Sequence, residues 1–81
     1  MNMRAKMLIT KIERHQHGQE TLHMTAVAKS TAYPADGADE DNTYAKFSPQ
    51  GTVSLTIANP ALIGKFEPGK KYYIDFTEAA A

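Results

Sequence analysis

The sequence contains no cysteine and no tryptophan, and it has no long apolar run. Without cysteine, disulfides and thiolate metal sites are excluded. Its apolar stretches fall well short of the roughly 18 residues that a membrane span needs, so we expect no membrane insertion. The start, MNMRAKMLIT, has basic residues but neither the apolar core nor the small-residue cleavage site of a signal peptide. We therefore expect the protein not to be secreted.

The formal net charge is zero, because nine Lys and Arg residues balance nine Asp and Glu residues. This balance argues against a global electrostatic attraction to nucleic acid. The charge is unevenly spread, since residues 1–30 carry a net +3 and residues 31–50 a net −3. Such a chain can meet a copy of itself head to tail. The alternative is a solvated strand face and a solvated loop.

A length of 81 residues indicates one domain, 1–81, without room for a second core. A chain of this size buries only about 60% of the surface that its unfolded form exposes, so an isolated monomer is marginally stable. Because disulfides are excluded, packing and association are the remaining supports. We therefore expect a protein partner or a homo-oligomer.

The first third of the chain predicts a hairpin. Apolar and polar residues alternate over Met3–Thr10, as in a half-buried strand, but Ile12 breaks the parity of Ile9. A β-bulge near Leu8–Lys11 would restore the parity and bend the strand. The polar segment HQHGQ, residues 15–19, is typical of a turn, and a second alternating strand follows over Thr21–Lys29.

The last third predicts two more strands and the turns between them. Thr52–Ala58 alternates cleanly, and Lys71–Thr77 alternates aromatic and polar residues. Between them, Asn59 followed by proline is a helix-start pattern, which predicts one helical turn over Pro60–Gly64. Glu67–Lys70 has proline second and glycine third, the type II turn arrangement, so Gly69 should have a positive φ.

These patterns together predict a mainly all-β protein. We expect a small antiparallel barrel or sandwich of four to five strands, with one short helical turn near 60–64. A short stretch at Tyr44–Phe47 is the candidate for the fifth strand. The core is predicted to consist of the inward apolar residues Met7, Ile9, Leu22, Met24, Val53, Leu55, Ile57, Tyr72, Ile74 and Phe76.

A long acidic loop at about 30–43, STAYPADGADEDNT, separates the two halves. Loops of this length are usually functional or disordered, and we expect this one to be mobile, with ordinary carboxyl pKa values. It is the candidate protein-binding site. The residues assigned to it are Tyr33, Asp36, Asp39, Glu40, Asp41 and Tyr44. A calcium site is the alternative, but the spacing differs from an EF-hand because Ala38 stands where a ligand belongs.

A second candidate surface is a basic face made by Arg4, Lys6, Lys11 and Tyr73. Small barrels with exposed aromatic residues can bind single-stranded nucleic acid by stacking. Here basic and aromatic residues do not interleave, and the acidic loop would repel phosphate. Nucleic acid is therefore the third hypothesis, after protein partners of two kinds.

Catalytic and metal-binding patterns are weak. A nucleophile needs an adjacent base, and the serines stand in a loop, a turn and a strand face without such a context. Zinc needs converging ligands, but a two-residue turn would pair His23 with Ile12 or Arg14 rather than with His15 or His17. We therefore expect neither enzymatic activity nor a cofactor or metal.

The segments EDNTYAKFSP, NPALIGKF and PGKKYYIDF, within Glu40–Thr77, resemble the C-terminal half of small proteins encoded by tailed bacteriophages. The start, MRAKMLITKIERH, is similar in kind. This family carries no motif of known chemistry, so no functional residue is transferred. The resemblance implies a phage protein in the host bacterial cytoplasm or in the virion. The leading hypothesis is a virion structural or decoration component that binds through its loop and its sheet edges. The alternative is an inhibitor that masks a host defence or regulatory protein.

Overall fold

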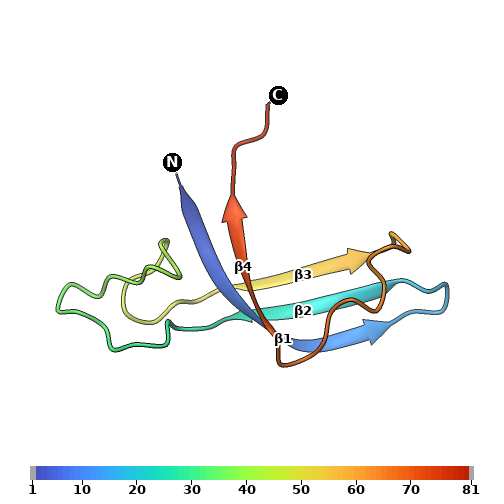
Figure 1. Cartoon of the computed structure of the whole chain (residues 1–81), viewed down its shortest axis with the longest axis horizontal. Helices are drawn as coiled ribbons and strands as arrows, with labels where there is room; N and C mark the ends of the chain where they lie inside the picture. The colour runs from blue at the N-terminus through green and yellow to red at the C-terminus, as the bar shows by residue number, and fades with distance from the viewer. Residues whose placement is uncertain (1, 81) are drawn as a thin grey trace.

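The computed structural model describes residues 2–80, in which four strands form one antiparallel sheet (Figure 1). Along the chain these strands are β1 (Met3–Arg14), β2 (Glu20–Ala26), β3 (Thr52–Ile57) and β4 (Lys71–Phe76). Their order in the sheet is β3-β2-β1-β4. The all-β prediction is confirmed. Among residues 2–80 a fifth strand does not form, because Lys46 makes only an isolated bridge to Ala38.

The predicted bulge in β1 is present and explains the shape of the sheet. The register with β2 shifts between Ile9 and Lys11, so Thr10 is the extra residue and Ile12 returns to the face of Ile9. The first half of β1 pairs with β4 and the second half with β2. Because a bulge bends its strand, the sheet curls into a half-barrel in which β4 stands across the direction of β2 and β3 (Figure 1).

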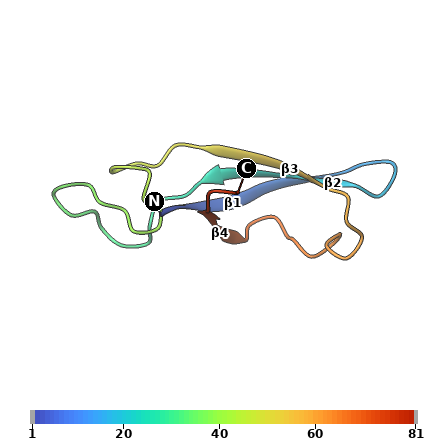
Figure 2. The same cartoon turned by 90° about the horizontal axis from the view of Figure 1, so that it is seen from above.

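The two faces of the sheet differ sharply in chemistry. In register, Ala5, Met7 and Ile9 share a face with Leu22 and Met24, and these five make the buried core. The opposite face carries most of the charged and hydroxyl side chains of the strands, with Glu20 an exception on the apolar face. The molecule is thin when seen edge-on (Figure 2), and its extents are 48 × 34 × 16 Å. A single sheet therefore has no second β layer to cover its apolar face.

Eight of the ten predicted core residues lie in or against the core. Four of these, Val53, Ile57, Tyr72 and Ile74, are only partly buried at the sheet margins. The prediction is wrong for Leu55 and Phe76, which are 52% and 44% exposed. Both face the apolar side, but Leu55 lies on the edge strand β3 and Phe76 at the end of β4. Side-chain direction alone does not bury a residue at a sheet margin.

The segment from 58 to 70 supplies the partial cover of the apolar face. The predicted helical turn over 60–64 is not found as a helix; Leu62 N–H donates to Asn59 O and Lys65 N–H to Leu62 O, which makes two successive turns. Asn59 does act as predicted at the start, since its Oδ1 accepts from Ala61 N–H at 3.0 Å. Phe66 packs against the core and meets Tyr72 edge-on at 5.3 Å.

A buried carboxylate ties this segment to the sheet. Glu20 is 1% exposed, and its Oε1 accepts from Gly64 N–H at 3.0 Å. Its Oε2 forms an ion pair with Arg14 at 2.8 Å, although the two groups are not aligned as a hydrogen bond. The Gly64 N–H and the Arg14 guanidinium thus compensate a carboxylate that would otherwise be costly to bury.

The turn before β4 has the predicted form. Gly69 has φ +88°, and Lys70 N–H donates to Glu67 O at 3.3 Å. Gly69 N–H also donates to Ile9 O, and Ile9 N–H to Lys70 O, so the turn is joined directly to the bulged part of β1. Within residues 2–80, no helix has the length and apolarity needed to cross a membrane.

Candidate protein-interaction site

The acidic loop folds back on β1 at the point where β2 has ended. There Val27 N–H donates to Lys6 O at 3.0 Å, and Thr43 N–H donates to Arg4 O at 3.0 Å. In return, Arg4 N–H donates to Thr43 Oγ1 at 2.9 Å and Lys6 N–H to Asn42 Oδ1 at 2.8 Å. Two side chains therefore replace the missing strand and satisfy backbone groups of β1 that would otherwise lack partners.

Asp39 and Asn42 hold the loop in this conformation. Asp39 is 4% exposed and Asn42 is 0% exposed. The Asp39 carboxylate accepts from the N–H groups of Asp41 and Asn42, from Tyr33 OH at 2.8 Å and from Asn42 Nδ2. Asn42 Nδ2 also donates to Val27 O at 2.8 Å. The expectation of a mobile loop is therefore wrong, because its polar groups are bonded to one another and to the sheet.

The pKa of Asp39 shows the same environment. Burial acts to raise this pKa, but the hydrogen bonds from Tyr33, Asn42 and the backbone outweigh it and hold the pKa below its usual value. The expectation of ordinary carboxyl pKa values in the loop is wrong for this residue. Burial and the bond to Asp39 raise the pKa of Tyr33.

The loop and the candidate basic face meet at Asp41. Its Oδ2 accepts from Lys6 Nζ at 3.2 Å and its Oδ1 from Tyr73 OH at 2.9 Å. The side chains of Lys6 and Asp41 are only 15% and 16% exposed. The hydrogen bond to Asp41 raises the pKa of Tyr73. Asp41 thus joins Lys6 and Tyr73, which the sequence analysis assigns to a separate surface, in one cluster.

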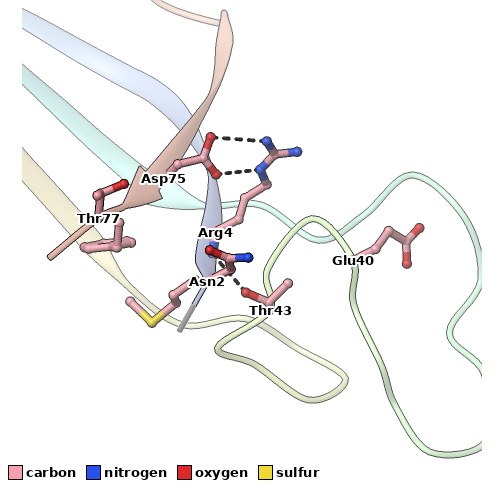
Figure 3. A pocket seen from close by; sticks show the side chains of 8 residues that line it. Asn2, Arg4, Glu40, Thr43, Asp75 and Thr77 are labelled. Atoms are coloured by element: carbon pink, nitrogen blue, oxygen red, sulfur yellow. Dashed lines mark hydrogen bonds and ion pairs between the residues drawn. The ribbon is translucent and has the colours of Figure 1, made fainter.

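Arg4 forms the outer part of this cluster, and its charge is also compensated. Its guanidinium makes two hydrogen bonds to Asp75, at 2.7 and 3.1 Å (Figure 3). It also lies 4.4 Å from the centre of the Tyr73 ring. These bonds raise the pKa of Arg4 and lower that of Asp75. Lys11 does not join the cluster, since it lies beyond the bulge, opposite His23.

A shallow hollow of about 390 Å³ lies beside Arg4, between the start of β1, the end of β4 and the loop (Figure 3). Asn2, Thr43, Asp75 and Thr77 contribute its polar lining. The Arg4 charge is taken up by Asp75, and Glu40 at the other side pairs with Lys29 at 3.2 Å. Among residues 2–80, the hollow therefore presents hydroxyl and amide groups, and its charged side chains are paired.

The remaining loop residues form a small aromatic cluster. The Tyr33 and Phe47 rings are 6.0 Å apart, and Lys29 lies 5.5 Å from the Tyr33 ring centre. Phe47 has φ +62°, which is rare for a non-glycine residue, and it is 49% exposed. Asp36 is exposed and accepts from Ala38 N–H, while Tyr44 is 37% exposed.

His23 lies on the polar face of the sheet, and His15 and His17 belong to the turn between β1 and β2. His23 is opposite Lys11, not Ile12 or Arg14 as predicted, because the turn places Arg14 opposite Glu20 and is therefore centred on His17 instead of being a two-residue turn. It contacts Glu13 at 2.5 Å, and this bond lowers the pKa of Glu13. His15 contacts Thr21 at 2.7 Å. Among residues 2–80, no group of three His, Cys, Asp or Glu residues is placed to hold a metal.

Sequence reasoning missed Asn42 and Thr43, which bond the loop to β1, and the ion-pair partners Lys29 and Asp75. A signal for Asn42 was available, because an aspartate three residues before it is a local turn pattern in which the carboxylate accepts from the following N–H groups. The contacts of Lys29 and Asp75 join residues far apart in the chain, and no local pattern indicates them.

The chain was compared with protein-family models, with curated proteins and with solved structures, and none of them matches it.

Proposed function

We propose that this protein is a non-catalytic structural component of a protein assembly. The observation that carries the proposal is the uncovered apolar side of a single open sheet. Among residues 2–80 only five apolar residues are buried, while Leu55, Leu62 and Phe76 are each more than 40% exposed. A partner that covered this face would supply the second layer that a sheet needs to bury its apolar side.

The shape of the molecule supports the same proposal. Its radius of gyration is 14.7 Å, whereas a compact domain of this length has about 12 Å. Its accessible surface is 5823 Å², against about 4,800 Å² for a monomer of this mass. The difference, about 1,000 Å², is close to the roughly 800 Å² that each partner buries in a standard interface.

The assembly we propose is a phage particle, in keeping with the resemblance of Glu40–Thr77 to tailed-bacteriophage proteins. The protein would then act as a decoration or tail component, made in the host cytoplasm. The contacts of the loop argue against the alternative of a host-protein inhibitor that mimics nucleic acid. Asp39 is buried, and Asp41 and Glu40 are paired with lysines of the same chain.

Binding of single-stranded nucleic acid also has less support than a protein partner. Tyr73 is 51% exposed, but Arg4 lies over its ring, and the Asp41 and Asp75 carboxylates flank it. A base would have to displace the guanidinium, and phosphate would approach two carboxylates.

Mass spectrometry of purified particles tests the proposed function. A structural component is expected in stoichiometric amounts relative to the major particle proteins, and Leu55→Lys is expected to reduce its incorporation. Lys11→Ala, on the opposite face, is the matched control and should incorporate normally. Recovery of the parent protein only in the soluble fraction of infected cells would refute a structural role and favour the inhibitor.

A further inference from the structure

The two edges of the sheet are not equivalent. β4 carries Lys71 and Asp75, and charged side chains on an edge strand discourage pairing with another strand. β3, with the sequence TVSLTI, has no charged residue and no proline. Among residues 2–80 no further strand pairs with its outer side. β3 is therefore an unprotected edge.

The hydrogen-bonding groups on that edge follow from the register. Ala26 N–H donates to Gly51 O at 2.9 Å, so residue 51 and the alternate residues after it turn their backbone groups toward β2. Thr52, Ser54 and Thr56 consequently turn their N–H and C=O groups outward. These three residues form a row of donors and acceptors that a new antiparallel strand can use.

The side chains of β3 restrict what that new strand can be. Val53, Leu55 and Ile57 face the apolar side, and Leu55 is 52% exposed although its partner in β2, Leu22, is 2% exposed. A matching strand must place apolar residues opposite these and hydroxyl residues opposite the outward row. β3 meets both requirements when it is paired with itself about a two-fold axis at Leu55, because Val53 then lies opposite Ile57 of the copy and Ser54 opposite Thr56.

We infer that the protein pairs with a second copy of itself, β3 to β3, to form a continuous eight-stranded antiparallel sheet with Leu55 at the two-fold axis. This inference rests on the proposed function and identifies the first partner in the assembly. The zero net charge places no electrostatic barrier between copies. The shared sheet brings the apolar faces of both copies onto one side, where a further member of the assembly can cover them together.

Sedimentation equilibrium of the purified full-length chain is the first test. The expected mass is twice the 8.9 kDa of the chain, at tens of micromolar concentration. Leu55→Lys and Leu55→Glu should each be monomeric, because like charges meet at the axis, and an equimolar mixture of the two should recover the dimer. Leu62→Lys changes a leucine of similar exposure outside β3, 44% against 52%, and should remain dimeric. A monomeric parent would overturn the inference, as would a mixture that stays monomeric.

Cysteine cross-linking tests the register, and the absence of native cysteine makes it unambiguous. In the proposed pairing the two Leu55 Cα atoms are about 4.5 Å apart, within the range of a disulfide. The two Val53 positions are displaced by four residues along the strands, about 13 Å. Leu55→Cys should therefore form a disulfide-linked dimer on oxidation, and Val53→Cys should not. Equal cross-linking of the two variants would overturn the pairing.

The outcomes separate this inference from the proposed function. A monomer in solution that is nevertheless stoichiometric in particles refutes self-pairing and leaves the structural role in place. A cross-linked Leu55→Cys dimer from a protein that is missing from particles supports self-pairing and refutes the structural role.

Discussion

The side chain of Asn42 accepts a hydrogen bond from the backbone N–H of Lys6 at 2.8 Å, and so a loop side chain takes the place of a strand beside β1. Because β2 ends at Ala26, the first half of β1 would otherwise present unpaired backbone groups on that side. The acidic loop is therefore a structural part of the sheet and also contributes residues to the candidate site.

Asn42→Ala is expected to destabilise the protein strongly. The change removes the hydrogen bond from Lys6 N–H to Asn42 Oδ1 and the one from Asn42 Nδ2 to Val27 O. Each buried group left without a partner costs about 1–3 kcal/mol. Asp36→Ala, which removes one exposed local bond of the same loop, should cost less than about 0.5 kcal/mol. Urea unfolding of the two variants measures the difference. Equal midpoints would mean that the loop is not anchored through Asn42.

Acid is expected to destabilise the protein through Asp39. The pKa of this residue is held below its usual value of 3.8 in the folded state, so its stabilising contribution is fully present above that value and is lost as the pH falls through the lowered folded pKa. The parent should therefore lose more stability between pH 5 and pH 3 than Asp39→Asn does, in unfolding experiments at both pH values. An equal loss in the two proteins would contradict this assignment.

Removing the negative charges of the acidic loop is expected to destabilise the protein. A variant with Asp36, Asp39, Glu40 and Asp41 replaced by amides should melt well below the parent, because it removes the acceptor at Asp39 and the charge that pairs with Lys6. Restoring only Asp39 should recover most of the difference. A melting temperature that stays low after this restoration would mean that Asp36, Glu40 and Asp41 provide the stabilisation instead.

Leu22 and Leu55 are opposite each other in register but should differ in their effect on the monomer. Leu22→Ala is expected to cost about 2–5 kcal/mol, because the side chain is buried in the core. Leu55→Ala should cost roughly 1 kcal/mol in dilute solution, because its side chain is half exposed. Thermal melts at low and high protein concentration check both values. The difference between the two destabilisations should become smaller at high protein concentration. There the dimer adds to the stability of the parent, and Leu55→Ala loses this contribution as well.

Gly37 and Gly18 form a matched pair for the packing of the loop. Both have a positive φ, +75° and +84°, so alanine strains the backbone at each by roughly 1–2 kcal/mol. Only at Gly37 would a Cβ atom meet a neighbour, the Phe47 ring at 2.5 Å. Gly37→Ala should therefore lower the melting temperature more than Gly18→Ala. Similar melting temperatures would show that Phe47 is not packed on Gly37.

Local sequence patterns were sufficient to predict the strands, the bulge and the turn before β4. Alternation reports which residues share a face, and the parity break at Ile12 reports the extra residue at Thr10. Gly69 follows from the backbone requirement of its turn. These features depend on residues only a few positions apart, so the sequence alone carried the information.

The burial of individual residues and the pairing of charges were determined by contacts between distant segments. Whether Leu55 is buried depends on its strand being the sheet edge, and whether Asp41 is a free charge depends on Lys6, 35 residues away. Neither property is encoded by the neighbouring residues. The sequence determined the composition of the strand faces and of the loop. Only the tertiary structure brought the acidic loop onto the basic face and left β3 at the edge, because these contacts form only when distant segments pack together.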